Sequence, residues 1–120
     1  MDPKDWKAGL IDTVTDFASS EYQERVWRRG EGPEVSSYGE AREFFFGLYM
    51  PEEHNQRIRE ALGFDDHQVN SLIELGNLLD EFAETVSDSP SASEVLDNPG
   101  WSNVREAARR ALDAIKEPRE

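Results

Sequence analysis

"DDHQVNSLIELGNLLDEFAETV", residues 65–86, is the stretch of the sequence that decides the fold. Its apolar residues recur every three or four positions, which predicts a long amphipathic helix with one buried face. Asp65 and Gln68 have the spacing of a capping box, which marks the start of that helix. The apolar stripe consists of Val69, Leu72, Ile73, Gly76, Leu79, Ala83 and Val86, with Leu75, Leu78 and Phe82 beside it.

The N-terminal part of the chain carries a second helix signal. Asp2 is suited to cap a helix, and Pro3 is suited to its first position. Apolar and aromatic residues follow at helical spacing, so this helix is predicted to run to about Arg28. Gly30 can adopt the left-handed conformation that often ends a helix.

Two more helices are predicted between these segments. Ser37 and Glu40 have capping-box spacing and open a helix at the following residue. This helix contains three consecutive phenylalanines at 44–46, which cannot all face one side. At least one of them is therefore expected to remain exposed or to pack against a separate element. Aromatic residues at helical spacing more often belong to the core than to a binding patch. Pro51 starts the next helix, and Gly63 ends it.

The C-terminal segment predicts the last helix. A polar loop at 87–93 and a short turn at 93–98 precede it, and Asp97 or Asn98 is expected to cap it. No run of the sequence alternates apolar and polar residues in the manner of a strand. The chain is therefore predicted to form one all-α domain, residues 1–120, folded as a bundle of about five helices. The inner face of the last helix is expected to consist of Trp101, Val104, Ala108, Ala111, Leu112 and Ile115.

The composition narrows the class of protein. The formal net charge of -13 opposes direct binding to nucleic acid or to an anionic membrane, because such binders present basic patches. No apolar run approaches the roughly 20 residues that a membrane helix needs. The chain has no Cys, which excludes disulfides and thiolate metal sites. The N-terminus lacks the basic-then-apolar order of a signal peptide, so a cytoplasmic protein is the default expectation.

The negative charge is concentrated in the middle of the chain. Residues 50–100 hold twelve acidic and two basic side chains, a net charge of -10, whereas the remaining residues have a net charge of -3. Such a surface favours a basic partner. The plainer alternative, a charged face that serves only solubility, stays open.

Two histidines lie beside carboxylates, His54 in "EEH" and His67 in "DDH". The spacing of a di-iron bundle requires Glu three residues before each His, and Pro51 and Phe64 occupy those positions. Acidic residues at a helix start are also explained by the helix dipole. No metal, no cofactor and no catalytic residue is therefore expected, and a metal-dependent helical enzyme using the two histidines is kept only as an alternative.

The least ordinary stretch is "EYQERVWRRGEGPEVSS", residues 21–37. Its glycines, proline and serine suit a turn between two helices, and its arginines suit the end of a helix. We predict that it is primarily a structural junction, with Trp27 packed and the arginines offsetting nearby acids. A phosphate-binding glycine loop is disfavoured because Glu31 and Glu34 would repel phosphate.

This stretch also resembles a string found in small acidic immunity proteins of bacterial polymorphic toxin systems. The segment "LDNPGWSNVREAA", residues 96–108, resembles the final helix of that family, whereas "YMPEEHNQRIREALGF", residues 49–64, departs from it. The resemblance implies inhibition of a cognate toxin by binding, and it names no particular toxin. The matching residues are Tyr22, Gln23, Arg25, Trp27, Gly30, Gly32, Pro33, Glu34 and Ser36.

The residues themselves favour a blocker of a basic protein, such as a nucleic-acid-processing toxin whose cleft binds phosphates. An acidic helical face can fill such a cleft and speed the encounter. An acidic mimic of nucleic acid that inhibits a DNA-binding protein is an alternative. The expected contacts are Asp65, Asp66, Glu74, Asp80, Glu81 and Glu84, then Glu31 and Glu34, with Tyr38 and Tyr49 as aromatic anchors.

Overall fold

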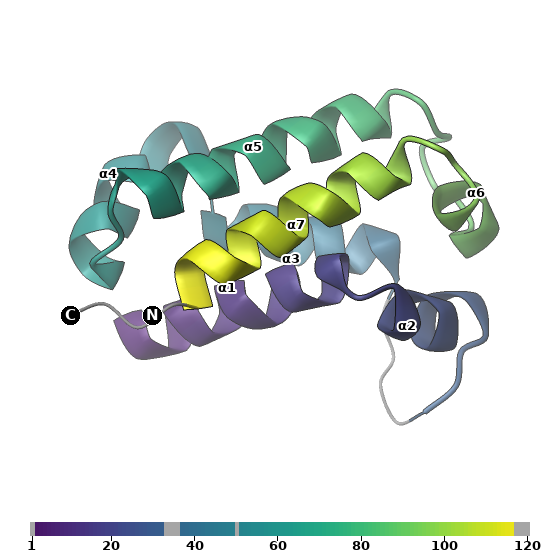
Figure 1. Cartoon of the computed structure of the whole chain (residues 1–120), viewed down its shortest axis with the longest axis horizontal. Helices are drawn as coiled ribbons and strands as arrows, with labels where there is room; N and C mark the ends of the chain where they lie inside the picture. Colours follow the sequence, from purple (N-terminus) through teal and green to yellow (C-terminus); the bar gives the residue numbers. More distant parts are fainter. Residues whose placement is uncertain (1, 33–36, 50, 117–120) are drawn as a thin grey trace.

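The computed structural model describes residues 2–32, 37–49 and 51–116, without the side chains of 51–55. Throughout these ranges the regular structure is helical, which confirms the all-α prediction (Figure 1). There are more helical elements than the five expected. They are α1 (Pro3–Ala18), α2 (Ser20–Tyr22), the π-helix η1 (Gln23–Arg28), α3 (Tyr38–Tyr49), α4 (Pro51–Leu62), α5 (Asp66–Ala83), α6 (Ala92–Leu96) and α7 (Trp101–Lys116).

The predicted N-terminal helix breaks at Ser19, so the prediction of one continuous helix is wrong. Ser19 adopts an extended backbone conformation, and its side chain accepts a hydrogen bond from the backbone N–H of Tyr22. This cap starts a new short helix, which continues into η1. The π-turn is closed by the hydrogen bond from the Arg29 N–H to the Glu24 carbonyl, five residues back. Gly30, at φ 66°, ends the segment close to the predicted position.

The start of α5 agrees with the sequence. Asp65 and Gln68 form the predicted capping box, in which each side chain accepts a hydrogen bond from the other residue's backbone N–H. Gly63 ends α4 with φ 69°, a conformation that favours glycine. The local cap residues therefore determine where these two helices meet.

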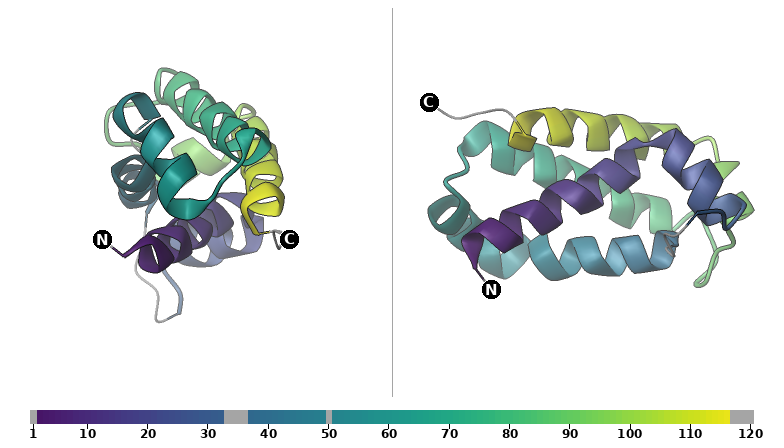
Figure 2. Two further views of the ribbon diagram at one scale, coloured as in Figure 1. Left: turned by 90° about the vertical axis from the view of Figure 1, so that its left-hand side faces the viewer. Right: turned by 90° about the horizontal axis from the view of Figure 1, so that it is seen from below.

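Four of the helices, α1, α3, α5 and α7, form a ring around one core. α1 packs against α7 and α3, and α5 packs against α7 and, less extensively, α3. The end view in Figure 2 shows α1 and α5 at opposite corners, with α4 passing across the end of the ring. The pair α1 and α3 therefore lies on the opposite side of the ring from the pair α5 and α7.

The core follows the predicted stripes closely. Leu79 is fully buried, as are Val69 and Leu72 earlier on the same face of α5. Leu75 and Phe82, which the sequence placed beside the stripe, are also buried, whereas the expected stripe residues Ile73, Ala83 and Val86 are half-buried. The buried residues of α7 are Trp101, Val104, Ala107, Ala108, Ala111, Ala114 and Ile115.

Candidate partner-binding site

The break after α1 leaves helix carbonyls that need hydrogen-bond donors, and Gln23 supplies them. The fully buried Gln23 amide donates through Nε2 to the Asp16 and Phe17 carbonyls, both at 2.8 Å. Its Oε1 accepts the indole N–H of Trp101 at 2.9 Å. One side chain thus joins the end of α1 to the start of α7.

Trp101 is the centre of the aromatic core. It has no exposed surface, and its ring lies 5.9 Å from that of Trp27 and 6.1 Å from that of Phe17. On its other sides it meets Tyr38 at 5.7 Å and Phe82 at 5.0 Å. Rings from five separate segments therefore meet at this residue.

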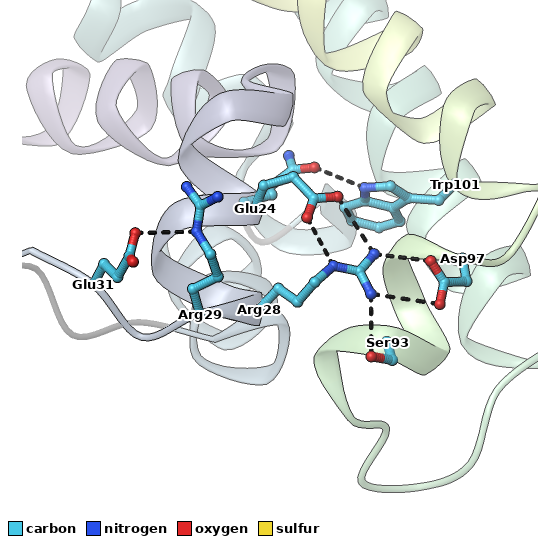
Figure 3. Close-up of polar contacts among 8 residues, drawn as sticks. Glu24, Arg28, Arg29, Glu31, Ser93, Asp97 and Trp101 are labelled. Atoms are coloured by element: carbon cyan, nitrogen blue, oxygen red, sulfur yellow. Dashed lines mark hydrogen bonds and ion pairs between the residues drawn. The ribbon is translucent and has the colours of Figure 1, made fainter.

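Arg28 joins η1 to α6 (Figure 3). Its Nε donates to Glu24 at 2.7 Å, and its Nη2 donates to Asp97 at 2.8 Å. Its Nη1 also donates to the Ser93 hydroxyl at 3.1 Å. The hydrogen bonds to Asp97 and Glu24 raise the pKa of Arg28, and the bond from Arg28 holds the pKa of Asp97 below its ordinary value.

These contacts bring together two stretches that lie far apart in the sequence, residues 21–37 and 96–108. Gln23 and Arg28 from the first stretch bond to Trp101 and Asp97 from the second. Trp27 is 8% exposed, so the prediction that Trp27 is packed is confirmed. We call these contacts of residues 21–32 with α6 and the start of α7 the junction.

The two acidic contacts predicted within residues 21–37, Glu31 and Glu34, differ in what the structure says of them. Glu31 is exposed and forms an ion pair with Nε of Arg29 at 3.0 Å (Figure 3). Glu34 lies outside the described residues.

The two predicted aromatic anchors are core residues instead. Tyr38 is 6% exposed and packs on Phe82 and Trp101, and Tyr49 is 1% exposed beside Phe45. Burial raises the pKa of both phenols, that of Tyr49 to about 12. Because α3 turns both rings inward, neither offers an aromatic surface to a partner, and we do not retain them as anchors.

The predicted acids around α5 do not share one face. The Asp65 side chain caps the helix, and Asp66 forms an ion pair with Arg59 of α4. Asp80 accepts a hydrogen bond from Nη2 of Arg42 on α3 at 2.6 Å, so it lies on the side of α5 that faces α3. Sequence spacing alone could not show these cross-helix pairs.

A second group of acids lies along a shallow groove between α5 and α7. Glu74 and Glu81 line its α5 side, seven residues apart, and Glu106 lines its α7 side. Arg110 of α7 donates through Nε to Glu74 at 3.0 Å. We call this surface the α5–α7 groove; it is lined by Asn70, Ile73, Glu74, Asn77, Leu78, Glu81, Asn103, Glu106 and Arg110.

Two of the predicted acidic contacts have no ion-pair partner in the described part of the chain. Glu81 and Glu84 are both exposed, and no ion pair of either is found among the residues that the structure describes. Glu81 points into the groove, whereas Glu84 caps the end of α5 and is not among the groove residues. Sequence reasoning missed Glu106. Its position on the outer side of the last helix could have suggested exposure, but nothing in the sequence aligned it with Glu81.

His67 is exposed in the first turn of α5, and the side chain of His54 lies outside the described residues. In the described part, no three His, Asp or Glu side chains gather in a way that could hold a metal ion. Likewise, no described helix has the length and apolar character to cross a membrane. Comparison of the chain with family models, curated proteins and solved structures gives no match.

Proposed function

We propose that this protein is an immunity protein that binds a cognate basic bacterial toxin and blocks its substrate cleft with the α5–α7 groove. The observation that carries this proposal is the groove itself. Three carboxylates, from Glu74, Glu81 and Glu106, lie on two packed helices and face solvent together.

The helices hold these carboxylates in place before any partner arrives. Leu75 and Leu79 on α5 and Ala108 and Ala111 on α7 are fully buried, so the two backbones are fixed by the core. A preorganised surface loses less conformational entropy on binding than a flexible one. The groove also contains the amides of Asn70, Asn77 and Asn103, which can hydrogen-bond to a partner and add specificity to the charge.

Internal pairing leaves the groove able to accept cations. Arg110 already pairs with Glu74, and Arg109 pairs with Glu106 at 3.1 Å, but both pairs are at the surface. Exposed pairs of this kind contribute little energy and exchange readily. A Lys or Arg of a partner can therefore compete for these carboxylates and engage Glu81, which has no such pair in the described part of the chain.

The toxin class rests on two supports. Nucleic-acid-processing toxins require basic clefts for phosphates, and the net charge of -13 complements such clefts. Residues 21–37 and 96–108 resemble the immunity family. Because the described part of the first stretch, residues 21–32, forms the junction with the second, we place the contacts that select one toxin elsewhere on the surface.

Coexpression with any basic toxin domain encoded by a neighbouring gene tests the proposal. Cells that express both are expected to survive, whereas cells with the toxin alone die. Purified proteins should form a complex whose association slows as salt rises, because exposed charges are screened over roughly 8 Å at physiological ionic strength. Absence of both protection and binding would exclude the immunity role for that toxin.

A further inference from the structure

The three consecutive phenylalanines of α3 have three different environments. Phe45 is fully buried, and Phe46 is half-buried with the Arg42 guanidinium 4.8 Å from its ring centre. Phe44 is 56% exposed, so the prediction that at least one of the three stays exposed or packs elsewhere is confirmed. In the described residues Phe44 is the large hydrophobic side chain that the fold leaves in solvent. The exposure of Phe44 needs an explanation, because an exposed ring adds little to the core.

Phe44 borders a small, mostly apolar groove between α1 and α3. Gly9 forms part of the groove, where an added Cβ would lie 3.0 Å from Cδ1 of Leu48 and 3.8 Å from Cε1 of Phe44. The Thr13 hydroxyl donates a hydrogen bond to the Gly9 carbonyl at 3.0 Å. The hydroxyl proton is therefore already bonded within α1. We call this surface the α1–α3 groove; it is lined by Gly9, Asp12, Thr13, Asp16, Glu40, Ala41 and Phe44.

The charged residues of the α1–α3 groove are all acidic. Asp12 and Asp16, one turn apart on α1, line it together with Glu40 on α3, and none of its described lining residues is basic. An apolar surface with an acidic edge is complementary to a segment that carries both apolar and basic side chains. The groove lies between the helix pair opposite to α5 and α7, so the two grooves face different directions (Figure 2).

We propose that the α1–α3 groove is a second interaction surface, which receives a basic amphipathic segment of a partner protein. An apolar side chain of that segment packs on Phe44, and a Lys or Arg beside it pairs with Asp12 and Glu40. Aromatic residues with exposed area are frequent energetic centres of interfaces, and the carboxylates set the charge of the partner. The proposal does not depend on what the α5–α7 groove binds.

A titration followed by nuclear magnetic resonance tests this proposal. The probe is a synthetic amphipathic helix of roughly 15 residues, with leucines on one face and lysines on the other. We expect the peptide to change the backbone amide chemical shifts of one set of residues most strongly. This set is Gly9, Asp12, Glu40, Ala41 and Phe44. A matched peptide with Gln in place of Leu, and another with Glu in place of Lys, should each bind much more weakly.

Two variants separate the apolar contribution from the charge. Phe44→Ala should lower the affinity for the lysine–leucine peptide about tenfold, and Asp12→Asn with Glu40→Gln should lower it about fivefold. Both proteins should keep the parent's helical spectrum, because Phe44 is largely exposed and Gln preserves the capping position. The matched control is Glu81→Gln with Glu106→Gln, which removes the same charge from the other groove.

The outcomes are distinct. Equal weakening by the control pair, or amide shifts centred on the α5–α7 groove, would show that the peptide follows general negative charge and would overturn the proposal. Unchanged affinity of the Phe44→Ala protein would do the same. Neither result depends on a toxin, so neither bears on the immunity proposal.

Discussion

The junction and the α5–α7 groove use polar side chains in opposite ways. In the junction, the side chains of Gln23 and Arg28 form hydrogen bonds with other parts of the same chain. In the groove, Glu81 and Glu106 extend into solvent from helices that are already held by their apolar faces. The polar groups of the junction therefore stabilise the fold, whereas those of the groove remain available for a partner.

The difference follows from burial. A polar group removed from water must find a partner or lose its hydration energy, so the buried Gln23 amide cannot be replaced cheaply. An exposed carboxylate keeps its hydration, so changing it alters the surface charge with little effect on folding. Mutations in the two regions should accordingly separate stability from binding.

The largest expected effect is at the centre of the junction. Trp101→Ala removes a fully buried ring that contacts four other aromatic rings, and it should lower the free energy of unfolding by about 3–5 kcal/mol. Urea denaturation followed by circular dichroism measures this change. A loss below about 1 kcal/mol would mean that the junction does not hold the helices together.

The next effect isolates the buried hydrogen bonds. Gln23→Leu keeps the volume roughly constant but leaves the Asp16 and Phe17 carbonyls and the Trp101 indole N–H without their partner. The expected loss of stability is about 1–3 kcal/mol. Trp101→Phe removes the indole N–H, so the double variant should lose less than the sum of the single losses. Additive losses would show that the Gln23–Trp101 bond contributes no coupling energy.

A smaller effect concerns the exposed edge of the junction and its pH dependence. The hydrogen bond from Arg28 lowers the pKa of Asp97 below the ordinary 3.8, so folding favours the ionised carboxylate. The resulting stability is present above pH 3.8 and is lost as the pH falls through the lowered pKa. Asp97→Asn should therefore be less stable than the parent at neutral pH and should approach it in acid. Urea denaturation at a series of pH values measures this, and a constant difference at every pH would contradict the pairing.

The smallest effect on stability is expected in the groove. Glu81→Lys with Glu106→Lys changes two exposed side chains, one of which has only a surface pair with Arg109. The free energy of unfolding should stay within about 0.5 kcal/mol per substitution. A thermal melt beside the parent protein checks this, and a loss comparable to that of Gln23→Leu would mean that the groove, too, is part of the scaffold.

Local signals predicted the helix starts well. The caps at Asp2, Ser37 and Asp65 depend on residues within one turn, and all three side chains accept a hydrogen bond from a backbone N–H of the helix that follows. The break at Ser19 was not predictable in the same way, because the apolar stripe continues across it. The break is supported by Gln23, whose partner Trp101 lies 78 residues away in the sequence.

The candidate site was predicted only in part, for a related reason. Exposure of Glu74 and Glu81 follows from their positions off the apolar stripe of α5. Which acids share a surface depends on neighbouring helices: Arg42 pairs with Asp80 on the α3 side, and α7 places Glu106 across from the α5 carboxylates. The aromatic character of Tyr38 and Tyr49 suggested anchors, but the direction in which α3 faces the core buries both.

The affinity of charge-reversed variants for the toxin tests the central claim most directly. The measurement is the dissociation constant of the complex for Glu81→Lys with Glu106→Lys, compared with Glu60→Lys with Asp113→Lys. Both pairs change the net charge equally, and Glu60 and Asp113 are exposed residues outside both grooves. We predict that the groove pair weakens binding at least about thirtyfold, equivalent to about 2 kcal/mol, while the control pair changes it only slightly. Equal weakening by both pairs, or tight binding by the groove pair in a folded protein, would contradict the assignment of the α5–α7 groove as the toxin-binding surface.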